Sequence, residues 1–413
     1  MSLIEFETKR CEVCGNERLR SVLDLGLHPM CDDLVPVGNA RVCKEYPIEI
    51  LYCDECRTAC QRFQIPKREL FPPTYHYRSR HTADVLNGMR QLVAACEESL
   101  GNLHGAKVLD IGCNDGSLLS IFRERGADTF GIEPTGAASD AQAAGHRVLN
   151  EFIDEDVAGR FSAQFGRPDI VTFTNVFAHI EDLPAVLRSL KLLAHPKTMI
   201  VIENHYLGSI LDGRQFDTFY HEHPRTYSYT SFVRIAETLG MRIRKVEFPA
   251  RYGGNIRVFL MQDDGEVGRS AHHRWEALDA KEKTFGHGLE QLSKQIDHWR
   301  ENKKRELEEA VRHHGVLEGK GFPGRAAIPI KMLNLGTSIV SAIYEKPESG
   351  KIGHYVPGTR IPIKSDNEFK ADSDGRPLVN MAWHISAEIE AYMRARGYQG
   401  PIIDIIAPGD FAE

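Results

Sequence analysis

Two rhythms of apolar residues alternate along residues 106–262. Short apolar runs predict strands, and longer segments with an apolar residue at every third or fourth position predict helices between them. Strands that alternate with helices favour a parallel α/β sheet with helical crossovers. The expected strands lie at 107–111, 128–132, 146–149, 169–174, 198–202, 242–247 and 256–261.

A long helical pattern follows this segment. From Trp275 to Val311 apolar residues recur at helical spacing among charged residues. This pattern predicts one long amphipathic helix that connects two parts of the protein, with a break at Gly286 or Gly288.

The strand and helix pattern returns in residues 317–413. Its spacing is typical of a second Rossmann-like unit, in which glycines allow a tight turn after the first strand. The sequence supports equally a unit that holds a nucleotide and a relic without a ligand. The expected elements are a glycine turn at 321–327, strands at 339–345 and 402–406, and a helix at 387–396.

The composition excludes several classes of protein. Hydrophobic residues make up 42% and charged residues 26% of the 413 residues, as in an ordinary soluble protein of several domains. The net charge of −7, from 51 basic and 58 acidic residues, argues against a general nucleic-acid partner or an anionic membrane surface. No apolar run approaches the roughly 20 residues of a membrane span, and residues 1–6 do not resemble a signal peptide. We therefore expect a cytoplasmic enzyme.

Two Cys-x-x-Cys pairs, Cys11 with Cys14 and Cys53 with Cys56, lie near the N-terminus. Four thiolates can surround one zinc ion and leave no open position, which predicts a structural zinc site. The 38 residues between the pairs must hold a small subdomain, with a turn at 24–29. The alternatives are chance spacing and a redox role, but neither pair lies at a strand-to-helix turn. The other cysteines are expected to be small buried side chains: Cys31, Cys43, Cys60, Cys96 and Cys113.

A polar turn follows the first strand of the α/β sheet. This strand ends near Asp110, Gly112 and Gly116 permit a tight turn, and free N–H groups of the next helix can bind a polar ligand. About 20 residues later Glu133 ends the second strand, where such folds hold a ribose diol. The combination resembles the S-adenosylmethionine (SAM) site of class I methyltransferases, and another doubly wound domain is the alternative. The cofactor-binding residues would be Asp110, Gly112, Asn114, Asp115, Gly116, Glu133 and Asn175.

Polar side chains also follow the later strands. Ligands in parallel sheets collect at the carboxyl ends of the strands, which selects Asn175 and Glu203 as lining positions. His179 lies just beyond the fourth strand, although a lone His at such a place is more often a structural residue. Before the sheet, residues 71–80 form a polar, aromatic connector that prolines keep out of a helix and that can pass over a ligand.

The segment 216–227 has the richest chemistry in the chain. It is too polar for a core strand and lacks a helical stripe, so we expect a loop. Tyr220, His221, Glu222 and His223 supply proton donors and acceptors, and His titrates near neutral pH. Metal binding by the two histidines is the alternative, but no third His or acidic residue has an obvious helical spacing with them.

The order of these motifs carries a more specific resemblance. The four cysteines precede a Tyr-x-Tyr connector, an Asp-x-Gly-x-Asn-Asp-Gly turn, Asn-x-x-x-His, a Tyr-x-Glu-His loop, Gly-Gly-Asn-x-Arg and the C-terminal unit. Over nearly its whole length the chain resembles the sugar C-methyltransferases that act on nucleotide-linked 4-keto-deoxyhexoses. In that family a His removes the proton beside a ketone, and the enolate attacks the SAM methyl group.

The resemblance implies a role for each part of the chain. The zinc would be structural, and the C-terminal domain would contact the nucleotide of the substrate. The catalytic residues would be His223 as the base, Glu222 to orient it or share its proton, Tyr220 and His179 to steady the oxyanion, and Tyr75 or Tyr77 to close the site.

Two departures from the family pattern leave the substrate open. The turn at 321–327 lacks the usual Gly-x-Gly-Ala-x-x-Lys pattern, and Trp383-His384 stands where the family has a Trp-Asn pair. Residues 355–363 keep the expected Pro-Gly-x-x-Ile-Pro run. We expect the reaction type to be retained, while the sugar, the methylated carbon and the nucleotide stay open.

The expected fold is therefore α/β, with a class I SAM methyltransferase core between a zinc-binding module and a second Rossmann-like domain. Its segments are the zinc module at 1–70, the methyltransferase domain with its connector at 71–265, the linking helix at 266–316 and the nucleotide-sugar-binding domain at 317–413. A zinc-containing O- or N-methyltransferase of small molecules and a non-catalytic SAM- or nucleotide-binding regulator are the alternatives. We expect a monomer or small homo-oligomer.

Overall fold

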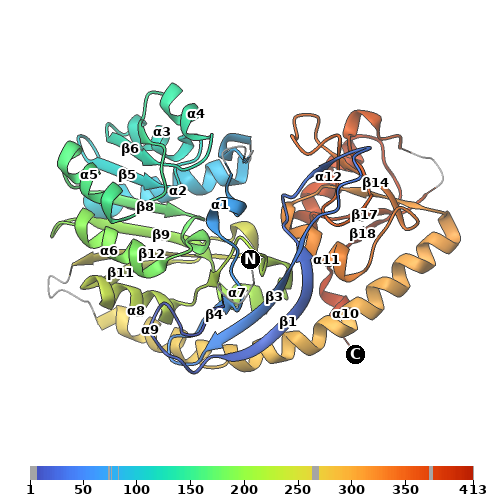
Figure 1. Cartoon of the computed structure of the whole chain (residues 1–413), viewed down its shortest axis with the longest axis horizontal. Helices are drawn as coiled ribbons and strands as arrows, with labels where there is room; N and C mark the ends of the chain where they lie inside the picture. The colour runs from blue at the N-terminus through green and yellow to red at the C-terminus, as the bar shows by residue number, and fades with distance from the viewer. Residues whose placement is uncertain are drawn as a thin grey trace. The chain divides into compact units, whose positions relative to one another are not determined.

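The computed structural model describes residues 7–72, 75, 77–81, 83–262, 269–371 and 375–412 (Figure 1). The chain forms two compact units, each assembled from segments that are far apart in the sequence. Unit 1 comprises Met1–Arg20, Leu51–Ile210 and Glu222–Gly286, and unit 2 comprises Ser21–Ile50, Leu211–His221 and His287–Glu413. The segment 216–227 is therefore divided between the units after His221.

Unit 1 contains a seven-stranded sheet with the strand order β11-β12-β9-β8-β5-β6-β7. The strands are β5 (Lys107–Ile111), β6 (Asp128–Ile132), β7 (Arg147–Leu149), β8 (Ile170–Thr174), β9 (Met199–His205), β11 (Met241–Glu247) and β12 (Asn255–Gln262). All seven expected strands are present, and β9 runs three residues further than predicted. The α/β core predicted from the sequence is thus confirmed.

The last strand departs from the expected parallel sheet. Strands β5 to β9 pair in parallel, whereas β12 pairs antiparallel with both β9 and β11. Only residues 248–254 connect β11 to β12, and a parallel pair would need a crossover of roughly a dozen residues or more. The short connection therefore makes β11 and β12 a hairpin.

Helices α2 (Ala83–Leu100) and α3 (Ser117–Glu124) pack against this sheet. Leu92 from α2, Phe122 from α3 and Val108 from β5 are fully buried in the shared core. Burial of a side chain of this size contributes roughly 1.5–3 kcal/mol. The other helices along this part of the chain are α1 (Lys67–Leu70), α4 (Ala138–Ala143), α5 (Glu155–Phe165), α6 (Leu183–Leu193), α7 (Leu207–Asp212), α8 (Tyr229–Leu239) and α9 (Arg269–Glu282).

The start of α8 is fixed by two acceptors. Ser228 and Ser231 form a capping box, and the buried carboxylate of Glu282 accepts the N–H groups of Tyr229 and Thr230 at 2.7 and 2.8 Å. A cap of this kind contributes about 1 kcal/mol. The end of the polar loop is thereby held at a fixed place in unit 1.

A small sheet has the order β1-β3-β4-β10, with β1 (Arg20–Pro29), β3 (Glu45–Cys53), β4 (Thr58–Gln61) and β10 (Arg225–Thr226). The turn predicted at 24–29 is wrong, because these residues belong to β1. The turn-forming residues act only locally: Asp24 accepts the N–H of Gly26 at 2.9 Å, and Gly26 has φ +83°. The Asp-x-Gly pattern therefore bends the strand without ending it.

Unit 2 contains a five-stranded sheet with the order β16-β14-β13-β17-β18. Its strands are β13 (Leu317–Lys320), β14 (Val340–Glu345), β16 (Ile363–Ser365), β17 (Leu378–Asn380) and β18 (Ile402–Asp404), with helices α11 (Ala327–Met332) and α12 (Ser386–Ala395). Every strand pair in this sheet is parallel, which confirms a second Rossmann-like unit. A separate two-stranded sheet pairs β2 (Val35–Pro36) with β15 (His354–Tyr355).

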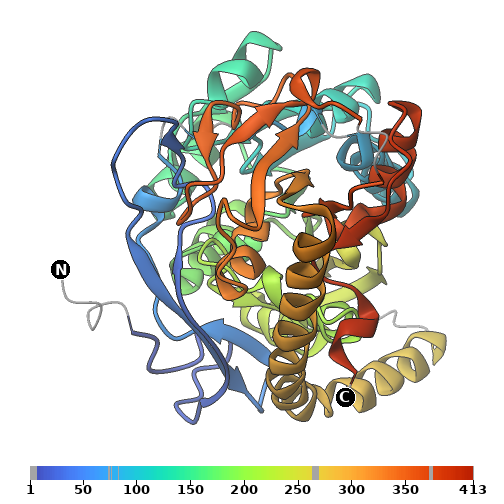
Figure 2. The same ribbon diagram turned by 90° about the vertical axis from the view of Figure 1, so that its right-hand side faces the viewer.

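The predicted long helix is two helices, α9 and α10 (Phe285–His314). The break lies at residues 283–284, and Gly286 and Gly288 are both inside α10. Thr284 donates to the carbonyl of Lys281 at 2.8 Å and so ends α9. Figure 2 shows α10 as a continuous helix beside the sheet of unit 2. Trp299 of α10 donates a 3.0 Å hydrogen bond to the carbonyl of Ile405, the residue after β18.

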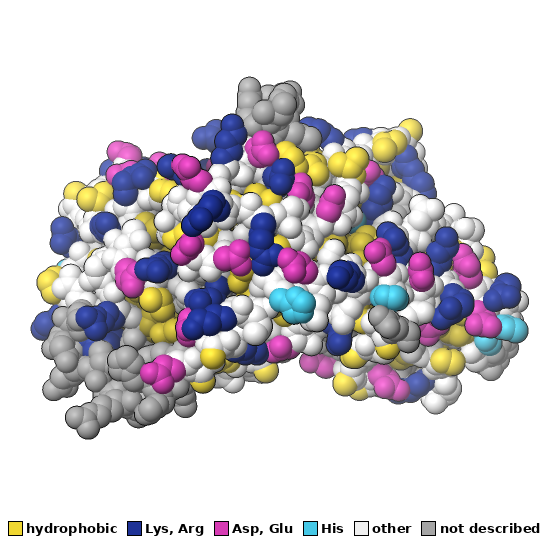
Figure 3. Space-filling model, turned by 90° about the horizontal axis from the view of Figure 1, so that it is seen from below, with side chains coloured by type: hydrophobic (Ala, Val, Ile, Leu, Met, Phe, Trp, Pro, Cys, Tyr) yellow, Lys and Arg dark blue, Asp and Glu magenta, His cyan; other side chains and the backbone are white. Residues whose placement is uncertain are grey.

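Charges of both signs are mixed on the surface. On the face shown in Figure 3, the Lys and Arg side chains are interspersed with Asp and Glu. This mixture agrees with the modest net charge of −7. Among the described residues, no helix is long and apolar enough to cross a bilayer.

Candidate active site and zinc centre

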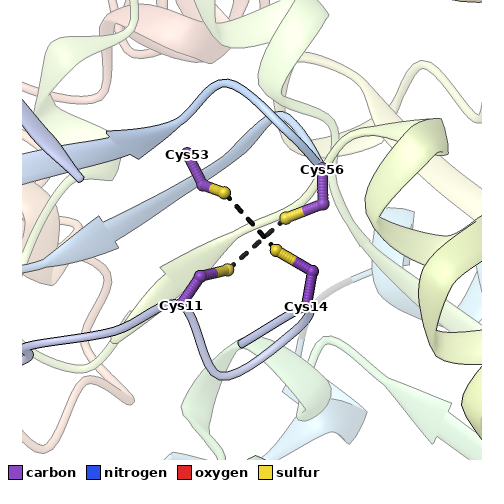
Figure 4. Close-up of side chains that lie close together, drawn as sticks. All are labelled: Cys11, Cys14, Cys53 and Cys56. Carbon is purple, nitrogen blue, oxygen red and sulfur yellow. Dashed lines mark hydrogen bonds between the residues drawn. The ribbon is translucent and has the colours of Figure 1, made fainter. Parts of the chain in front are cut away.

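The four cysteines of the two Cys-x-x-Cys pairs converge in unit 1 (Figure 4). Their sulfur atoms all lie within 4.8 Å of one another, with Cys11 3.4 Å from Cys56 and Cys14 3.5 Å from Cys53. A tetrahedron of thiolates is the donor set of a structural zinc site, with no position left for a substrate. Within the described part of the chain, no other group of three or more His, Cys, Asp or Glu side chains could hold a metal, so nothing here supports the His-x-His alternative.

The two cysteine turns share one backbone geometry. The N–H of Gly15 donates to the carbonyl of Cys11 at 2.7 Å, and the N–H of Arg57 donates to the carbonyl of Cys53 at 2.8 Å. The residue after each second cysteine is left-handed, with φ +79° at Gly15 and +56° at Arg57. Gly15 is suited to this conformation, whereas Arg57 adopts it despite its side chain.

Strand β4 connects the second cysteine turn to the polar loop. It pairs antiparallel with β10, and the N–H of Gln61 donates to the carbonyl of Pro224 at 2.9 Å. The Thr58 hydroxyl lies 3.0 Å from the sulfur of Cys56 and 2.8 Å from the hydroxyl of Ser231. The strand that leaves the zinc turn therefore lies beside the residues that follow His223.

Arg225 makes a second connection between these regions. Its guanidinium is buried and donates to the carboxylate of Glu12, which lies between two zinc ligands in the sequence. It also donates to the carbonyls of Ile180 and Glu181, just after His179. The sequence pattern did not single out Arg225 or Glu12, because their link depends on chain segments brought together only by folding.

The predicted cofactor turn lies at the carboxyl end of β5. Asp110 is buried, and burial raises the pKa of its carboxyl to about 7, although Thr172 donates a 2.7 Å hydrogen bond that favours the charged form. Gly112 has φ +73°, and a Cβ atom there would lie 2.5 Å from the side chain of Val176. Gly116 has φ +77° at the start of α3. Both glycines therefore occupy positions that other residues would strain.

The polar side chains of this turn are joined to the second strand and to the connector. Glu133 accepts the N–H of Asn114 at 2.9 Å and the N–H of Thr135 at 2.9 Å. The Asn114 side chain accepts the N–H of Ser79 at 3.0 Å and donates to the carbonyl of Tyr77 at 3.1 Å. The connector is thus fastened to the glycine turn at residues 77–79.

Asp115 extends this attachment. Its carboxylate accepts the N–H of Arg80 at 2.9 Å and the N–H of Ser117, the first residue of α3, at 3.1 Å. The side chains of Asn114 and Asp115 therefore position the connector. Their predicted role in cofactor binding stays a prediction.

Three imidazoles gather beside the polar loop in unit 1. The ring of His223 lies 4.9 Å from the ring of His179 and 5.2 Å from the ring of His205, measured between centroids. Phe71 packs edge-on against His179 at 5.2 Å. The sequence predicted His179 and His223 but not His205, the last residue of β9. The rule that ligands collect at the carboxyl ends of strands could have found it.

His179 is held by the polar loop. Its Nδ1 lies 2.6 Å from the carbonyl oxygen of Glu222, and because a carbonyl only accepts, Nδ1 carries the proton. Burial lowers the pKa of His179 to about 4, so the ring is neutral at pH 7. This hydrogen bond makes His179 an anchor for the loop, and its predicted role in steadying the oxyanion stays a prediction.

The three predicted tyrosines occupy different places. The Tyr75 hydroxyl lies 3.5 Å from a carboxylate oxygen of Glu222, a long contact between the connector and the loop. The side chain of Tyr77 is 40% exposed. Tyr220 belongs to unit 2, whereas Glu222 and His223 belong to unit 1.

Glu203, expected to line the site, has a structural role. It is fully buried, and its two carboxylate oxygens accept from Arg251 at 2.5 Å and from Arg257 at 2.6 Å. Asn255 donates to the same carboxylate at 2.9 Å and to the side chain of Asn175 at 3.1 Å. The Gly-Gly-Asn-x-Arg motif therefore braces the carboxyl ends of β8 and β9.

The glycine turn of unit 2 repeats part of this arrangement. The backbone N–H of Phe322 donates to the carboxylate of Glu345 at the end of β14, as Asn114 does to Glu133 in unit 1. Next to the turn, Arg325 forms a buried ion pair with Asp217 at 2.9 Å. Both Rossmann-like units thus join the first glycine turn to an acid at the end of the second strand.

Three family models match successive parts of the chain. Residues 11–71 match a "Putative zinc binding domain", residues 79–246 a "Methyltransferase domain" and residues 250–405 a "C-methyltransferase C-terminal domain". The chain is a SAM-dependent C-methyltransferase. Its seven-stranded sheet is the class I methyltransferase core, and the four cysteines provide its structural zinc site.

Comparison with curated proteins gives the same family. The C-methyltransferase NovU of Streptomyces niveus is 27% identical to this C-methyltransferase over 392 residues, which cover 92% of this chain and 90% of NovU. The ubiquinone biosynthesis O-methyltransferase of Acinetobacter baylyi is 33% identical over 104 residues, only 24% of this chain and 44% of that protein. The similarity to NovU thus extends over nearly the whole chain.

Solved structures resemble part of this C-methyltransferase. Magnesium protoporphyrin IX methyltransferase from Synechocystis covers 44% of this chain and 84% of its own, with 19% identity and a TM-score of 0.34. The PH0226 protein from Pyrococcus horikoshii covers 48% of this chain and 98% of its own, with 14% identity and a TM-score of 0.37.

Proposed function

We propose that this C-methyltransferase methylates the carbon beside the ketone of a nucleotide-linked 4-keto-deoxysugar, with His223 as the base. The observation that carries the proposal is the cluster of His179, His205 and His223, next to Glu222 and in the same unit as the glycine turn. A carbon-bound hydrogen is weakly acidic, so its removal needs a positioned base. The similarity to a C-methyltransferase over 92% of the chain supports methylation at carbon.

The residues of the loop would act on one proton. His223 takes the proton from carbon, and the electron pair of the C–H bond moves toward the ketone oxygen. The carboxylate of Glu222, adjacent in the chain, favours the imidazolium that results. Tyr220 stays the predicted oxyanion donor, and one such donor contributes roughly 3–4 kcal/mol.

The glycine turn would hold the cofactor. Bound SAM supplies the electrophilic methyl group. The left-handed Gly112 lets the backbone approach a ligand closely, and Glu133 lies where related folds bind a ribose. Asp110 is buried, and it would contribute a carboxyl group whose pKa burial raises to about 7.

Unit 2 would bind the nucleotide of the substrate. Its all-parallel sheet and the Phe322–Glu345 hydrogen bond repeat features of the cofactor-binding turn. The Tyr355–Ile363 segment keeps the Pro-Gly-x-x-Ile-Pro run of sugar C-methyltransferases. These features support a nucleotide-linked substrate rather than a free sugar.

Methyl transfer and deuterium exchange together test the proposal. The purified enzyme is incubated with SAM and nucleotide-linked keto sugars, and mass spectrometry follows the gain of a methyl group. In deuterated buffer without SAM, the substrate should exchange its hydrogen beside the ketone. Methylation of oxygen or nitrogen without such exchange would contradict the proposal, and ligand binding without any methyl transfer would favour a regulator.

His223→Ala tests the base. We expect the rates of exchange and methylation to fall by about 10²–10⁴-fold, because general-base catalysis contributes that much. The zinc content and the affinity for SAM should not change. His287→Ala, on an exposed part of α10, is the control variant. Full activity of His223→Ala would exclude His223 as the base.

A further inference from the structure

Asp217, in the polar loop before Tyr220, is a charged residue that the proposed reaction does not yet use. It belongs to unit 2, and its side chain is fully buried. One carboxylate oxygen accepts the Nε–H of Arg325 and the Nε1–H of Trp383, each at 2.9 Å, and the other accepts from Nη2 of Arg325 at 3.1 Å. Three hydrogen bonds from two side chains therefore fix the orientation of this carboxylate.

Both donor side chains lie at the carboxyl end of the parallel sheet of unit 2. Arg325 belongs to the glycine turn that follows β13, and Trp383 begins a short 3-10 helix three residues after β17. Strands β13 and β17 are neighbours in this sheet. Ligands of parallel sheets bind at this end of the strands. Asp217 is therefore attached to the part of unit 2 that is proposed to bind the nucleotide.

The attachment extends along the chain to Tyr220. Asp217 is the middle residue of the 3-10 helix η4 (Phe216–Thr218), which ends two residues before Tyr220. On the other side, Nε2 of His221 lies 3.2 Å from the carbonyl oxygen of Tyr46 and, because a carbonyl only accepts, donates to it. Every other residue from the start of η4 to His221 is buried, whereas Tyr220 is half-buried. The loop thus presents Tyr220 between two anchored neighbours of the same unit.

We propose that Asp217 is a positioning residue that joins the nucleotide-binding turn of unit 2 to Tyr220. The inference rests on the proposed function, which assigns the nucleotide to unit 2 and the oxyanion to Tyr220. Nucleotide contacts that order the turn around Arg325 also order the carboxylate that Arg325 holds. Binding energy from a part of the substrate that does not react is thereby used to orient an oxyanion donor, which raises kcat instead of only lowering KM.

A double-mutant cycle with Tyr220→Phe tests this role. Asp217→Asn keeps the shape of the side chain and removes the charge that pairs with Arg325. We expect it to lower kcat by about tenfold or more, within the roughly 10²–10³-fold loss expected when Tyr220→Phe removes the oxyanion donor itself. A residue that acts through Tyr220 has nothing left to position in Tyr220→Phe, so the double variant should match Tyr220→Phe within about twofold.

Trp383→Phe is the milder variant of the cycle, because it removes one hydrogen-bond donor and keeps the ion pair of Asp217 with Arg325. It should lower kcat by about threefold, and this loss should also disappear in the Tyr220→Phe background. Losses that remain in full in that background would show a merely structural role and would overturn the proposal. Full activity of Asp217→Asn would overturn it as well, and so would full activity of Trp383→Phe if Asp217→Asn does not fold.

A shortened substrate shows whether the nucleotide acts through Asp217. The nucleotide-linked keto sugar that the wild-type enzyme methylates is compared with the corresponding sugar 1-phosphate, which lacks the nucleoside monophosphate. In the wild type, kcat should be about tenfold or more higher with the full substrate, whereas in Asp217→Asn the two values should agree within about twofold. Equal ratios in the two enzymes would overturn the proposal. The control variant Glu318→Gln, at a carboxylate of β13 that accepts from the Tyr344 hydroxyl at 2.9 Å, should behave as the wild type.

The positioning role and the proposed function fail in different ways. If wild-type enzyme methylates the keto sugar with deuterium exchange at carbon, and the losses of Asp217→Asn and Tyr220→Phe add, the proposed function stands and only the positioning role is wrong. If wild-type enzyme methylates oxygen or nitrogen without such exchange, the proposed function is wrong and the positioning role falls with it.

Discussion

Asp110→Asn tests the most unusual electrostatic feature of the cofactor turn. Burial raises the pKa of Asp110 from 3.8 to about 7, against the 2.7 Å hydrogen bond from Thr172. The unfolded chain ionises this carboxyl near pH 4, while the folded protein keeps it protonated until about pH 7. Stability is therefore lost as the pH rises between these values. Three pKa units correspond to roughly 4 kcal/mol of unfolding free energy.

Chemical denaturation at several pH values measures this effect. Asn has the shape of the protonated carboxyl and can accept the Thr172 hydroxyl, but it does not ionise. The unfolding free energy of Asp110→Asn relative to wild type should therefore rise by about 1.4 kcal/mol per pH unit between pH 4 and 7 and stay constant above. Asp128→Asn, at an exposed carboxyl at the start of β6, should show no such rise.

One result would refute this reasoning. Parallel stability curves for wild type and Asp110→Asn across this pH range would mean that Asp110 ionises normally in the folded protein. The negative charge of its carboxylate would then have to be hydrated or offset by neighbouring groups. The turn after β5 would offer a fully charged group to the cofactor.

Three further predictions concern the zinc site, the buried ion pairs and the glycine turn. Cys56→Ser removes one of the four thiolates, so metal analysis should show loss of zinc and the melting temperature should fall, whereas Cys60→Ser, outside the cluster, should keep the metal. Glu203→Gln removes the carboxylate charge shared by two buried guanidinium groups, of which Arg257 keeps its ion pair with Glu247. It should cost about 3–5 kcal/mol in denaturation experiments, and a cost under about 1 kcal/mol would contradict the buried network. Gly112→Ala places a Cβ atom 2.5 Å from the nearest side chain and should weaken SAM binding in calorimetry, whereas Gly159→Ala, with open space around it, should bind SAM normally.

The features that could be predicted from the sequence are those that local patterns determine. The apolar runs that predict strands depend only on residues close together in the sequence. The strands expected in unit 1 are therefore present. Gly112 and Gly116 were expected to take positive φ, and both do, at +73° and +77°. The cysteine pairs were recognisable because metal coordination demands a short, specific spacing.

The features that escaped prediction depend on contacts between distant segments. Glu203 ends a strand as an active-site acid would, but Arg251 and Arg257 return from β12 and its preceding turn to neutralise it. The end position of His205 in β9 could be read from the strand pattern, but its place beside the ring of His223 depends on folding. A local signal also misled: the Asp24-x-Gly26 pattern forms its own hydrogen bond inside β1 instead of a turn between elements.

The contacts of the zinc module explain why a metal without a chemical role belongs in this enzyme. Glu12, within the first cysteine pair, accepts from Arg225, two residues after the proposed base His223. From the second pair, β4 runs antiparallel to β10, which contains Arg225. Both halves of the zinc site therefore hold the same short stretch of chain. A loop with almost no regular structure cannot place an imidazole by itself, because nothing in its own backbone offsets the entropy of ordering it. Coordination of the four sulfurs would join the Glu12–Arg225 contact and the β4–β10 pairing into one body. The loop would then be held from both sides at the residues that directly follow His223.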